Sequence, residues 1–294
     1  MKLIGRVKNG NYWICMFSDG TKIRKNGLNF FEPEKPESMD LKITNSCHGT
    51  NCKFCHEDSG PKGKHGDIMN LKFIDTLLPY TELAIGGGNP LEHPDLIPFL
   101  KKCKKKKLIC NMTVNQVHFM NNQELIKQLV DEKLIYGLGI SLVSINDKFL
   151  NAVKQYPNAV IHMINGVHKV EEFRKLYDKD LKILILGYKE FRRGKSFYSK
   201  EVEFEKERTL VFLPEIIEHF DVVSFDNLAL DQLDVKSLLS PKEWKLFYMG
   251  NDGTFTMYVD AVEKTFSKSS TTPIEERQPL MDDIKPMFEY VRSH

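Results

Sequence analysis

Between residues 39 and 226, short apolar segments alternate with longer amphipathic ones. The short segments are rich in Ile, Leu, Val and Met, as buried strands are, and they cover residues 39–44, 82–86, 108–114, 135–143, 159–164 and 181–187. Strand patterns that alternate with helix patterns favour parallel strands joined by crossover helices. The sequence therefore predicts an α/β fold with six βα units, a partial (β/α)6 version of the eight-stranded TIM-like barrel.

The segments on either side of this core have different patterns. Residues 1–38 contain short alternating runs broken by Asn9-Gly10 and Asp19-Gly20, which predict a small N-terminal β-meander. Residues 227–294 are dense in aromatic residues and Met, and we expect this C-terminal α+β extension to close the barrel. Three segments, 1–38, 39–226 and 227–294, are thus predicted.

Three cysteines lie close together just after the first predicted strand of the core. Cys47, Cys52 and Cys55 have the spacing C-x4-C-x2-C. Three thiolates on one loop can bind a 4Fe-4S cluster and leave one iron open for a small molecule. The cysteines therefore predict an iron–sulfur site with an open position.

Other sites remain possible for the same cysteines. The spacing also matches a plant-type two-iron site, whose fourth ligand would be Cys103 or Cys110, although Cys103 lies in a lysine run expected to be a solvated helix face. A zinc site could be completed by one of three nearby histidines, His48, His56 or His65. Disulfides are disfavoured, since six cysteines without a signal peptide indicate a reducing, cytoplasmic setting.

A second motif follows the second predicted strand. Residues 86–88 are three glycines, and Asn89 and Pro90 come directly after them. Glycines at a strand end allow a ligand to approach the backbone, but they are also common in tight turns. In combination with the cysteines, the motif favours a ligand site.

These two motifs resemble those of the radical S-adenosylmethionine (radical SAM) enzymes. The cysteine loop follows the first strand, Phe54 precedes the last cysteine, and the glycines followed by Pro90 and His93-Pro94 are similar to the family's GGEP and HP pattern. Two departures are present. The family usually has three residues between its first two cysteines, where this chain has four, and Asn89 stands where the family has a glutamate.

The resemblance implies a cofactor set and a reaction. Cys47, Cys52 and Cys55 would bind a 4Fe-4S cluster, whose open iron takes S-adenosyl-L-methionine. A flavodoxin or ferredoxin would supply one electron, and SAM cleavage would give a 5′-deoxyadenosyl radical that abstracts a hydrogen atom from an unidentified small-molecule, nucleotide or peptide substrate. The residues implied to contact SAM are Gly87, Gly88, Asn89, Asn115, Ser141 and Phe54, together with the strand 161–166. The alternative is a non-catalytic iron–sulfur or zinc protein that transfers electrons or binds a partner.

Substrate residues are expected at the barrel mouth, where the carboxyl ends of the strands meet. The candidates there are Lys189, Arg192 and Arg193, which follow the sixth strand, and, at or beyond the end of the core, Asp226, Asn227 and Tyr258. We expect the three basic residues to select an anionic substrate, a phosphate or a carboxylate, and to lie away from the cysteine loop. A solvated loop, or contacts with the carboxylate of SAM, would explain them as well. The formal net charge of +2 does not indicate nucleic-acid binding, and no apolar stretch predicts a membrane span.

Overall fold

The computed structural model describes residues 2–28 and 30–294. In this part of the chain, ten strands form one large sheet in the order β10-β9-β8-β7-β6-β5-β4-β11-β12-β13. All pairs from β10 to β11 are parallel, and β12 and β13 add two antiparallel pairs at one end. The strands are β4 (Ser38–Thr44), β5 (Glu82–Gly87), β6 (Ile109–Asn115), β7 (Gly137–Ser141), β8 (Ala159–Ile164), β9 (Lys182–Leu186), β10 (Val222–Phe225), β11 (Thr256–Asp260), β12 (Thr265–Ser267) and β13 (Gln278–Pro279).

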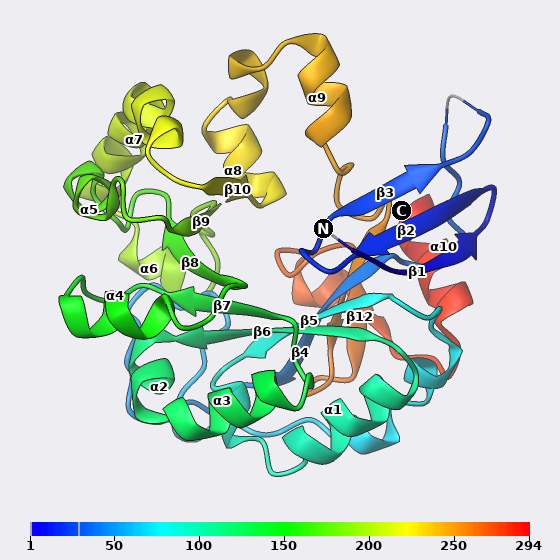
Figure 1. Cartoon of the computed structure of the whole chain (residues 1–294). Coiled ribbons are helices and arrows are strands. Elements are labelled where there is room, and N and C mark those ends of the chain that lie inside the picture. Colours follow the sequence, from blue (N-terminus) through cyan, green and yellow to red (C-terminus); the bar gives the residue numbers. More distant parts are fainter. Residues whose placement is uncertain (1, 29) are drawn as a thin grey trace.

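The helices connect these strands and cover the outside of the curved sheet (Figure 1). Helices α1 to α3 lie along one side of it, and the long helix α7 packs against α5. The helices are α1 (Leu96–Lys105), α2 (Gln116–Asn121), α3 (Gln123–Asp131), α4 (Asp147–Val153), α5 (Val170–Leu176), α6 (Arg193–Phe197), α7 (Lys200–Glu218), α8 (Asn227–Gln232), α9 (Pro241–Phe247) and α10 (Ile284–Ser293). No helix in the described ranges combines the length and apolar character needed to cross a bilayer.

The predicted α/β class with a mostly parallel sheet is confirmed, but the partial barrel is not. The sheet is open, with β10 and β13 at its edges. The six predicted strands correspond to β4 through β9, and two further parallel strands flank them. One of these, β11, belongs to the C-terminal segment and pairs with β4. The sheet is therefore larger and more open than the sequence pattern indicated.

A smaller antiparallel sheet lies beside the main one. It consists of β1 (Leu3–Asn9), β2 (Tyr12–Phe17) and β3 (Lys22–Lys25), in the order β1-β2-β3. Tyr12 and Ile14 of β2 pack against Phe255, just before β11. The N-terminal meander therefore contacts the C-terminal segment.

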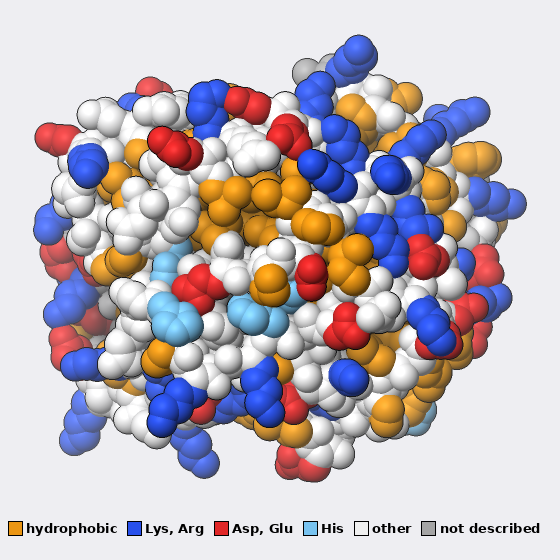
Figure 2. All heavy atoms as spheres, turned by 90° about the horizontal axis from the view of Figure 1, so that it is seen from below, with side chains coloured by type: hydrophobic (Ala, Val, Ile, Leu, Met, Phe, Trp, Pro, Cys, Tyr) orange, Lys and Arg blue, Asp and Glu red, His pale blue; other side chains and the backbone are white. Residues whose placement is uncertain are grey.

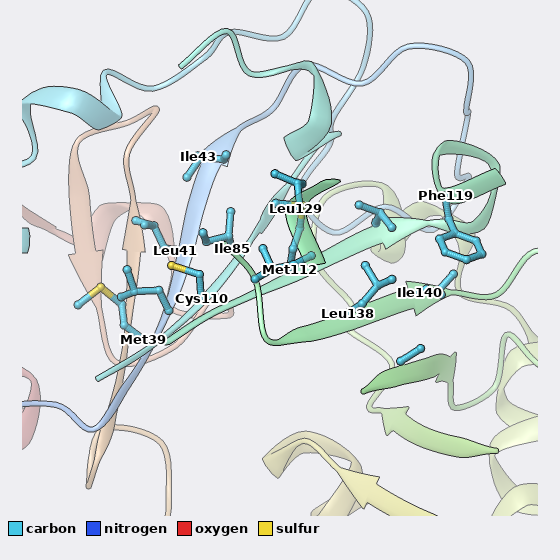
Figure 3. Packing of buried hydrophobic residues seen from close by; sticks show 14 of the residues in the cluster. Met39, Leu41, Ile43, Ile85, Cys110, Met112, Phe119, Leu129, Leu138 and Ile140 are labelled. Carbon is cyan, nitrogen blue, oxygen red and sulfur yellow. The ribbon is translucent and has the colours of Figure 1, made fainter. Parts of the chain in front are cut away.

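Side chains alternate between the two faces of the parallel strands, and this alternation separates the core from the site. On one face, apolar residues of β4 to β7 pack against Phe119 of α2 and Leu129 of α3 (Figure 3). The labelled strand residues of this layer are Met39, Leu41, Ile43, Ile85, Cys110, Met112, Leu138 and Ile140. The opposite face carries polar residues and glycines, and it borders a cavity.

Candidate functional site

A cavity of about 280 Å³ lies on the concave face of the sheet, toward the carboxyl ends of β4 to β8. In parallel α/β folds this end of the sheet is where active sites are built. The predicted site residues that line the cavity are Cys47, Cys52, Cys55, Phe54, Gly87, Gly88, Asn115, Ser141, Lys189, Arg193 and Tyr258. The fold thus brings together residues from both motifs and from the C-terminal segment.

The three cysteine side chains are partly buried on the loop of residues 45–60, which we call the cysteine loop. Its two ends are tied, because Cys47 N donates to the Gly60 carbonyl at 3.0 Å. Cys47 Sγ lies 3.0 Å from Thr50 Oγ1 and 3.4 Å from Nε2 of His118. Burial raises the pKa of the Cys47 thiol above its usual range, so a positively charged ligand would be needed to favour its thiolate.

A neighbouring polar group reaches the second thiol. Asn115 ends β6 and caps α2, since its Oδ1 accepts from Val117 N at 2.8 Å. Its Nδ2 lies 3.7 Å from Cys52 Sγ. Burial is the main cause that raises the pKa of the Cys52 thiol, and the nearby thiols of Cys55 and Cys47 raise it further. Asn115 is therefore placed beside the cysteines.

The glycines after β5 differ in what surrounds them. A Cβ on Gly87, whose φ is +112°, would lie 2.1 Å from the Thr44 carbonyl oxygen, and one on Gly88 would lie 2.1 Å from that of Ser46. These two glycines let the end of β5 pack directly on the backbone of the cysteine loop. A Cβ on Gly86 would have nothing within 4 Å, although Gly86 lines the cavity. Gly86 thus borders the open space.

Asn89 is buried outside the lining of the cavity. Its side chain accepts from Leu91 N at 3.2 Å and donates to Glu92 Oε1 at 2.9 Å. Glu92 also accepts from the backbone N and from Nδ1 of His48, at 3.1 and 2.8 Å. Although partial burial raises the pKa of Glu92, the hydrogen bonds from His48, Asn89 and Ser46 outweigh that effect and hold it at about 2. Asn89 therefore supports the cysteine loop through Glu92.

A buried ionic cluster, which the sequence analysis missed, borders the cavity. Lys42 is 2% exposed, and its Nζ lies 2.9 Å from Glu57 Oε2 and 3.0 Å from Asp260 Oδ2. Tyr258 donates to Glu57 Oε1 at 3.3 Å, and Arg277 lies 3.6 Å from Asp260. The cluster joins β4, the cysteine loop and β11. A lysine between two apolar residues, Leu41 and Ile43, of a strand was the available signal, because such a buried charge needs partners.

The two arginines after β9 contact the cysteine loop, so the expectation that they lie away from it is wrong. Arg192 Nη1 donates to the Glu57 carbonyl at 2.7 Å. Arg193 bonds to the Ser59 carbonyl, and its Nε lies 2.9 Å from Asp58. The loop after β9 folds back over a segment about 135 residues earlier in the chain. The arginines thus brace the loop, and of the two only Arg193 lines the cavity.

Comparison with solved structures identifies the fold. It resembles that of SuiB from Streptococcus suis. The superposition with SuiB has a TM-score of 0.61 at 12% identity and covers 100% of this chain and 91% of that one. For SuiB bound to its precursor peptide SuiA the TM-score is 0.60 at 14% identity, covering 90% and 68% of the two chains. For SuiB bound to S-adenosylmethionine it is 0.58 at 13% identity, covering 90% and 67%.

At the level of sequence the chain has no comparable match. No family model matches it, and no curated protein does. Since the identity to SuiB is 14% or less, the similarity establishes the shared fold and nothing finer. The chemistry has to be argued from the residues of the SuiB-like fold described above.

The remaining candidates fall in different places. Lys189 Nζ donates to Ser270 Oγ at 3.0 Å and lines the cavity, as does Tyr258. Asp226 instead caps α8, accepting from Ala229 N at 2.8 Å, and it lines a neighbouring cavity of about 250 Å³ with Asn227. Of the substrate candidates, Lys189, Arg193 and Tyr258 thus face the main cavity.

The other cysteines and the metal alternatives can also be placed. Cys103 and Cys110 are buried in the core, on the face of the sheet away from the cavity. The expectation that Cys103 lies on a solvated helix face is wrong, since α1 turns it inward beside Leu100 and Phe99. Within residues 2–28 and 30–294, no three His, Cys, Asp or Glu side chains converge as ligands of one metal ion.

The face of the molecule drawn in Figure 2 carries charged side chains of both signs. Hydrophobic side chains gather near its middle, with histidines next to them, and basic side chains gather toward its upper right (Figure 2).

Proposed function

We propose that the chain is an iron–sulfur enzyme of the radical SAM type, which cleaves S-adenosylmethionine reductively and uses the product to take a hydrogen atom from a substrate. One observation carries the proposal: the three thiols of the cysteine loop share a single cavity with the glycine-rich end of β5 and the polar ends of β6 and β7. That SuiB, which has a similar fold, binds S-adenosylmethionine supports the same choice of ligand.

The residues present suit a cluster. Thiolates are the usual ligands of iron–sulfur clusters, and three of them leave one iron of a four-iron cluster for another ligand. Such a cluster is bound through several irons, so its thiolates can surround a volume, whereas zinc ligands must meet at one point. Cysteines that line one cavity without converging on a single ion therefore favour the cluster over zinc.

When bound, a reduced four-iron cluster supplies the electron that splits S-adenosylmethionine into methionine and a 5′-deoxyadenosyl radical, which then removes a hydrogen atom from the substrate. The residues of this chain would bind and orient the cluster, S-adenosylmethionine and the substrate. Cys47, Cys52 and Cys55 would hold the cluster. Asn115 would donate toward the sulfur of Cys52, and such second contacts tune a cluster. The electron would come from a flavodoxin or ferredoxin.

The rest of the cavity wall would hold the organic ligands. Gly86 leaves room at the end of β5, and Gly87, Gly88 and Ser141 line the same cavity with backbone and hydroxyl groups. Phe54 packs edge-to-face against Phe197 at 5.7 Å and would form an apolar wall. Lys189, Arg193 and Tyr258 remain candidates for substrate contacts. The substrate itself is a small molecule, a nucleotide or a peptide, and the SuiB complex with SuiA supports testing peptides first.

Removal of single thiols tests this proposal. After anaerobic reconstitution with iron and sulfide, each of Cys47→Ala, Cys52→Ala and Cys55→Ala is expected to lose the bound iron and the visible charge-transfer absorption, because each removes a ligand. Cys103→Ala and Cys110→Ala are matched controls, since both thiols are buried away from the cavity. Iron loss in those controls, with circular dichroism unchanged, would support the two-iron alternative, and stoichiometric zinc in the purified protein would support the zinc one.

A further inference from the structure

The main cavity and the neighbouring cavity share part of their walls. Three residues line both of them: Asp40 on β4, Lys189 after β9 and Ser270 after β12. The neighbouring cavity lies between the first half of β4 and β11, the end of β10 and the start of α8. A ligand that occupies the main cavity beyond the cysteines therefore has Asp40 and Lys189 at its border.

Asp40 is a carboxylate without a partner at this border. Across the sheet it lies in register with Ala84 on β5, which has no polar side chain, and with Tyr258 on β11, whose hydroxyl donates to Glu57. Among the described residues, no hydrogen bond or ion pair reaches the Asp40 side chain. Asp40 is accessible to water within the cavity, so its charge faces the space that a ligand would fill.

A second unpartnered group lines the same cavity from the other side of the sheet. His162 on β8 is 8% exposed, and in the described part of the chain neither of its ring nitrogens has a hydrogen-bond partner. A Cβ on Gly139 of β7 would lie 2.4 Å from its Nε2, so the glycine makes room for the ring. Its ring can pair with a ligand or with water, and because β8 lies four strands from β4 it belongs to the far wall of the cavity.

We propose that the part of the cavity at Asp40 is the substrate site, and that it selects a substrate bearing a protonated amine or guanidinium, with the cation against Asp40. The inference rests on the proposed function, because it assigns the rest of the cavity to cluster and S-adenosylmethionine. It names a chemical class, which a small amine or a lysine or arginine side chain of a peptide would satisfy.

The charges around Asp40 favour a cation over an anion. Lys42, the nearest lysine on the same strand, is already paired with Glu57 and Asp260. Lys189 hydrogen-bonds to Ser270 and is not within ion-pair distance of Asp40. Asp226 and Asp252 add negative charge in the neighbouring cavity. Desolvation, with smaller effects of Asp252, Asp226 and Glu57, raises the pKa of Asp40 to about 6 against the lowering effect of Lys189, and a bound cation would relieve it.

Binding of matched probes tests the charge preference. We would measure pentylamine, pentylguanidine, 1-pentanol and pentanoate by ligand-observed NMR on the full chain, reconstituted anaerobically with iron and sulfide and with S-adenosylmethionine present. The two cations are expected to bind at least about tenfold more tightly than pentanol, as one charge-assisted hydrogen bond allows. Equal binding of all four probes would overturn the proposal. Tighter binding of pentanoate, lost in Lys189→Met, would overturn it in favour of an anion site.

Variants locate the site. Asp40→Asn is expected to bring the affinity for both cations down to that for pentanol. Asp252→Asn, a carboxylate that lines only the neighbouring cavity, is the matched control and is expected to change it less than twofold. Loss of cation binding in Asp252→Asn, with cation binding retained in Asp40→Asn, would overturn the assignment to Asp40. If Asp40→Asn does not fold, Asp40→Ser serves the same comparison.

Two further measurements complete the test. One distinguishes a small amine from a peptide side chain as the source of the cation, and the other distinguishes failure of the cation site from failure of the proposed function. An acetyl-Gly-Lys-Gly-amide peptide that binds more tightly than pentylamine, and more tightly than its norleucine counterpart, would identify a peptide side chain as the source. Wild-type protein that binds cations but never forms 5′-deoxyadenosine would contradict the proposed function and leave the cation site standing. Wild-type protein that forms 5′-deoxyadenosine but shows no charge preference would contradict only the cation site.

Discussion

At the scale of single residues, glycines that look equivalent in the sequence have different roles. Gly87 and Gly88 allow β5 to approach the backbone of the cysteine loop, whereas Gly86 faces open space. A side chain at Gly88 would therefore disturb the loop itself, and a side chain at Gly86 would fill only the cavity. The two positions separate ligand binding from cluster assembly.

We expect Gly86→Val to block S-adenosylmethionine binding while iron content stays at the wild-type level, because the added methyl groups enter the cavity without striking the backbone. Gly88→Val is expected to lose both, since its Cβ would lie 2.1 Å from the Ser46 carbonyl. Equilibrium dialysis with labelled S-adenosylmethionine and an iron assay measure the two effects. Full binding in Gly86→Val would show that the ligand lies elsewhere.

We expect the charged carboxylate of Asp40 to lower the free energy of unfolding of the protein. Its pKa is raised from 3.8 to about 6, so the folded state holds the proton more tightly than the unfolded state does. The destabilisation is absent below about pH 4, grows between pH 4 and 6, and is complete above that. Asp40→Asn should remove it. Because the carboxylate is accessible in the cavity, we expect about 1 kcal/mol, or about 2 °C in Tm, at pH 7.5.

Thermal unfolding of wild type and Asp40→Asn at pH 4 and pH 7.5 checks this expectation. The two proteins should be closest in Tm at pH 4. An Asp40→Asn variant that is less stable than wild type at pH 7.5 would show that the carboxylate has a structural partner in solution.

At the scale of elements, the loop after β9 and the cysteine loop form one unit. Arg192 and Arg193 donate to backbone carbonyls of residues 57 and 59, and charge-assisted bonds of this kind contribute about 1.5–3 kcal/mol each. The cysteine loop has no helix or strand of its own between residues 47 and 60, so these contacts help to fix its shape, together with those of Glu57 to Lys42 and of His48 to Glu92. The arginines therefore act on the cysteines from a distance in sequence.

We expect Arg192→Met to raise amide hydrogen exchange in residues 45–60 by about tenfold, because the Glu57 carbonyl loses its donor. Exchange in the rest of the sheet should not change. Arg174→Met is a suitable control, since Arg174 pairs with Glu215 on an exposed helix surface. Unaltered exchange in residues 45–60 of the Arg192→Met protein would mean that the arginine does not brace the loop.

The elements also show what local sequence can predict. Strands β4 to β9 each have an apolar face and are separated by helical segments, so their periodicity alone placed them. β10 is only four residues long and was missed. Cys103 was placed on the wrong side of α1, because the lysines around it obscured its helical spacing from Leu96, Phe99 and Leu100, which share its buried face. The spacing of these four residues indicated a shared buried face, whereas the lysines alone indicated a solvated one.

At the scale of the whole molecule, the sequence indicated which residues gather around the cavity better than it indicated the architecture. The cysteine and glycine motifs were found because each is contiguous, and the cavity contains both. The open sheet, the pairing of β11 with β4 and the cluster around Lys42 depend on contacts between distant segments. No local pattern specifies such partners, and the same holds for Asp40 and His162. The division into segments 1–38, 39–226 and 227–294 stays a prediction.

The central claim is that the cavity binds a cluster and S-adenosylmethionine together and joins them in one reaction. The most direct test is to reconstitute the full chain anaerobically with iron and sulfide, add dithionite and S-adenosylmethionine, and quantify 5′-deoxyadenosine by chromatography and mass spectrometry. We predict 5′-deoxyadenosine and methionine in equal amounts from the wild-type protein, and neither above background from Cys52→Ala. A protein that binds about four irons and reduces normally, yet leaves S-adenosylmethionine intact, would contradict the account.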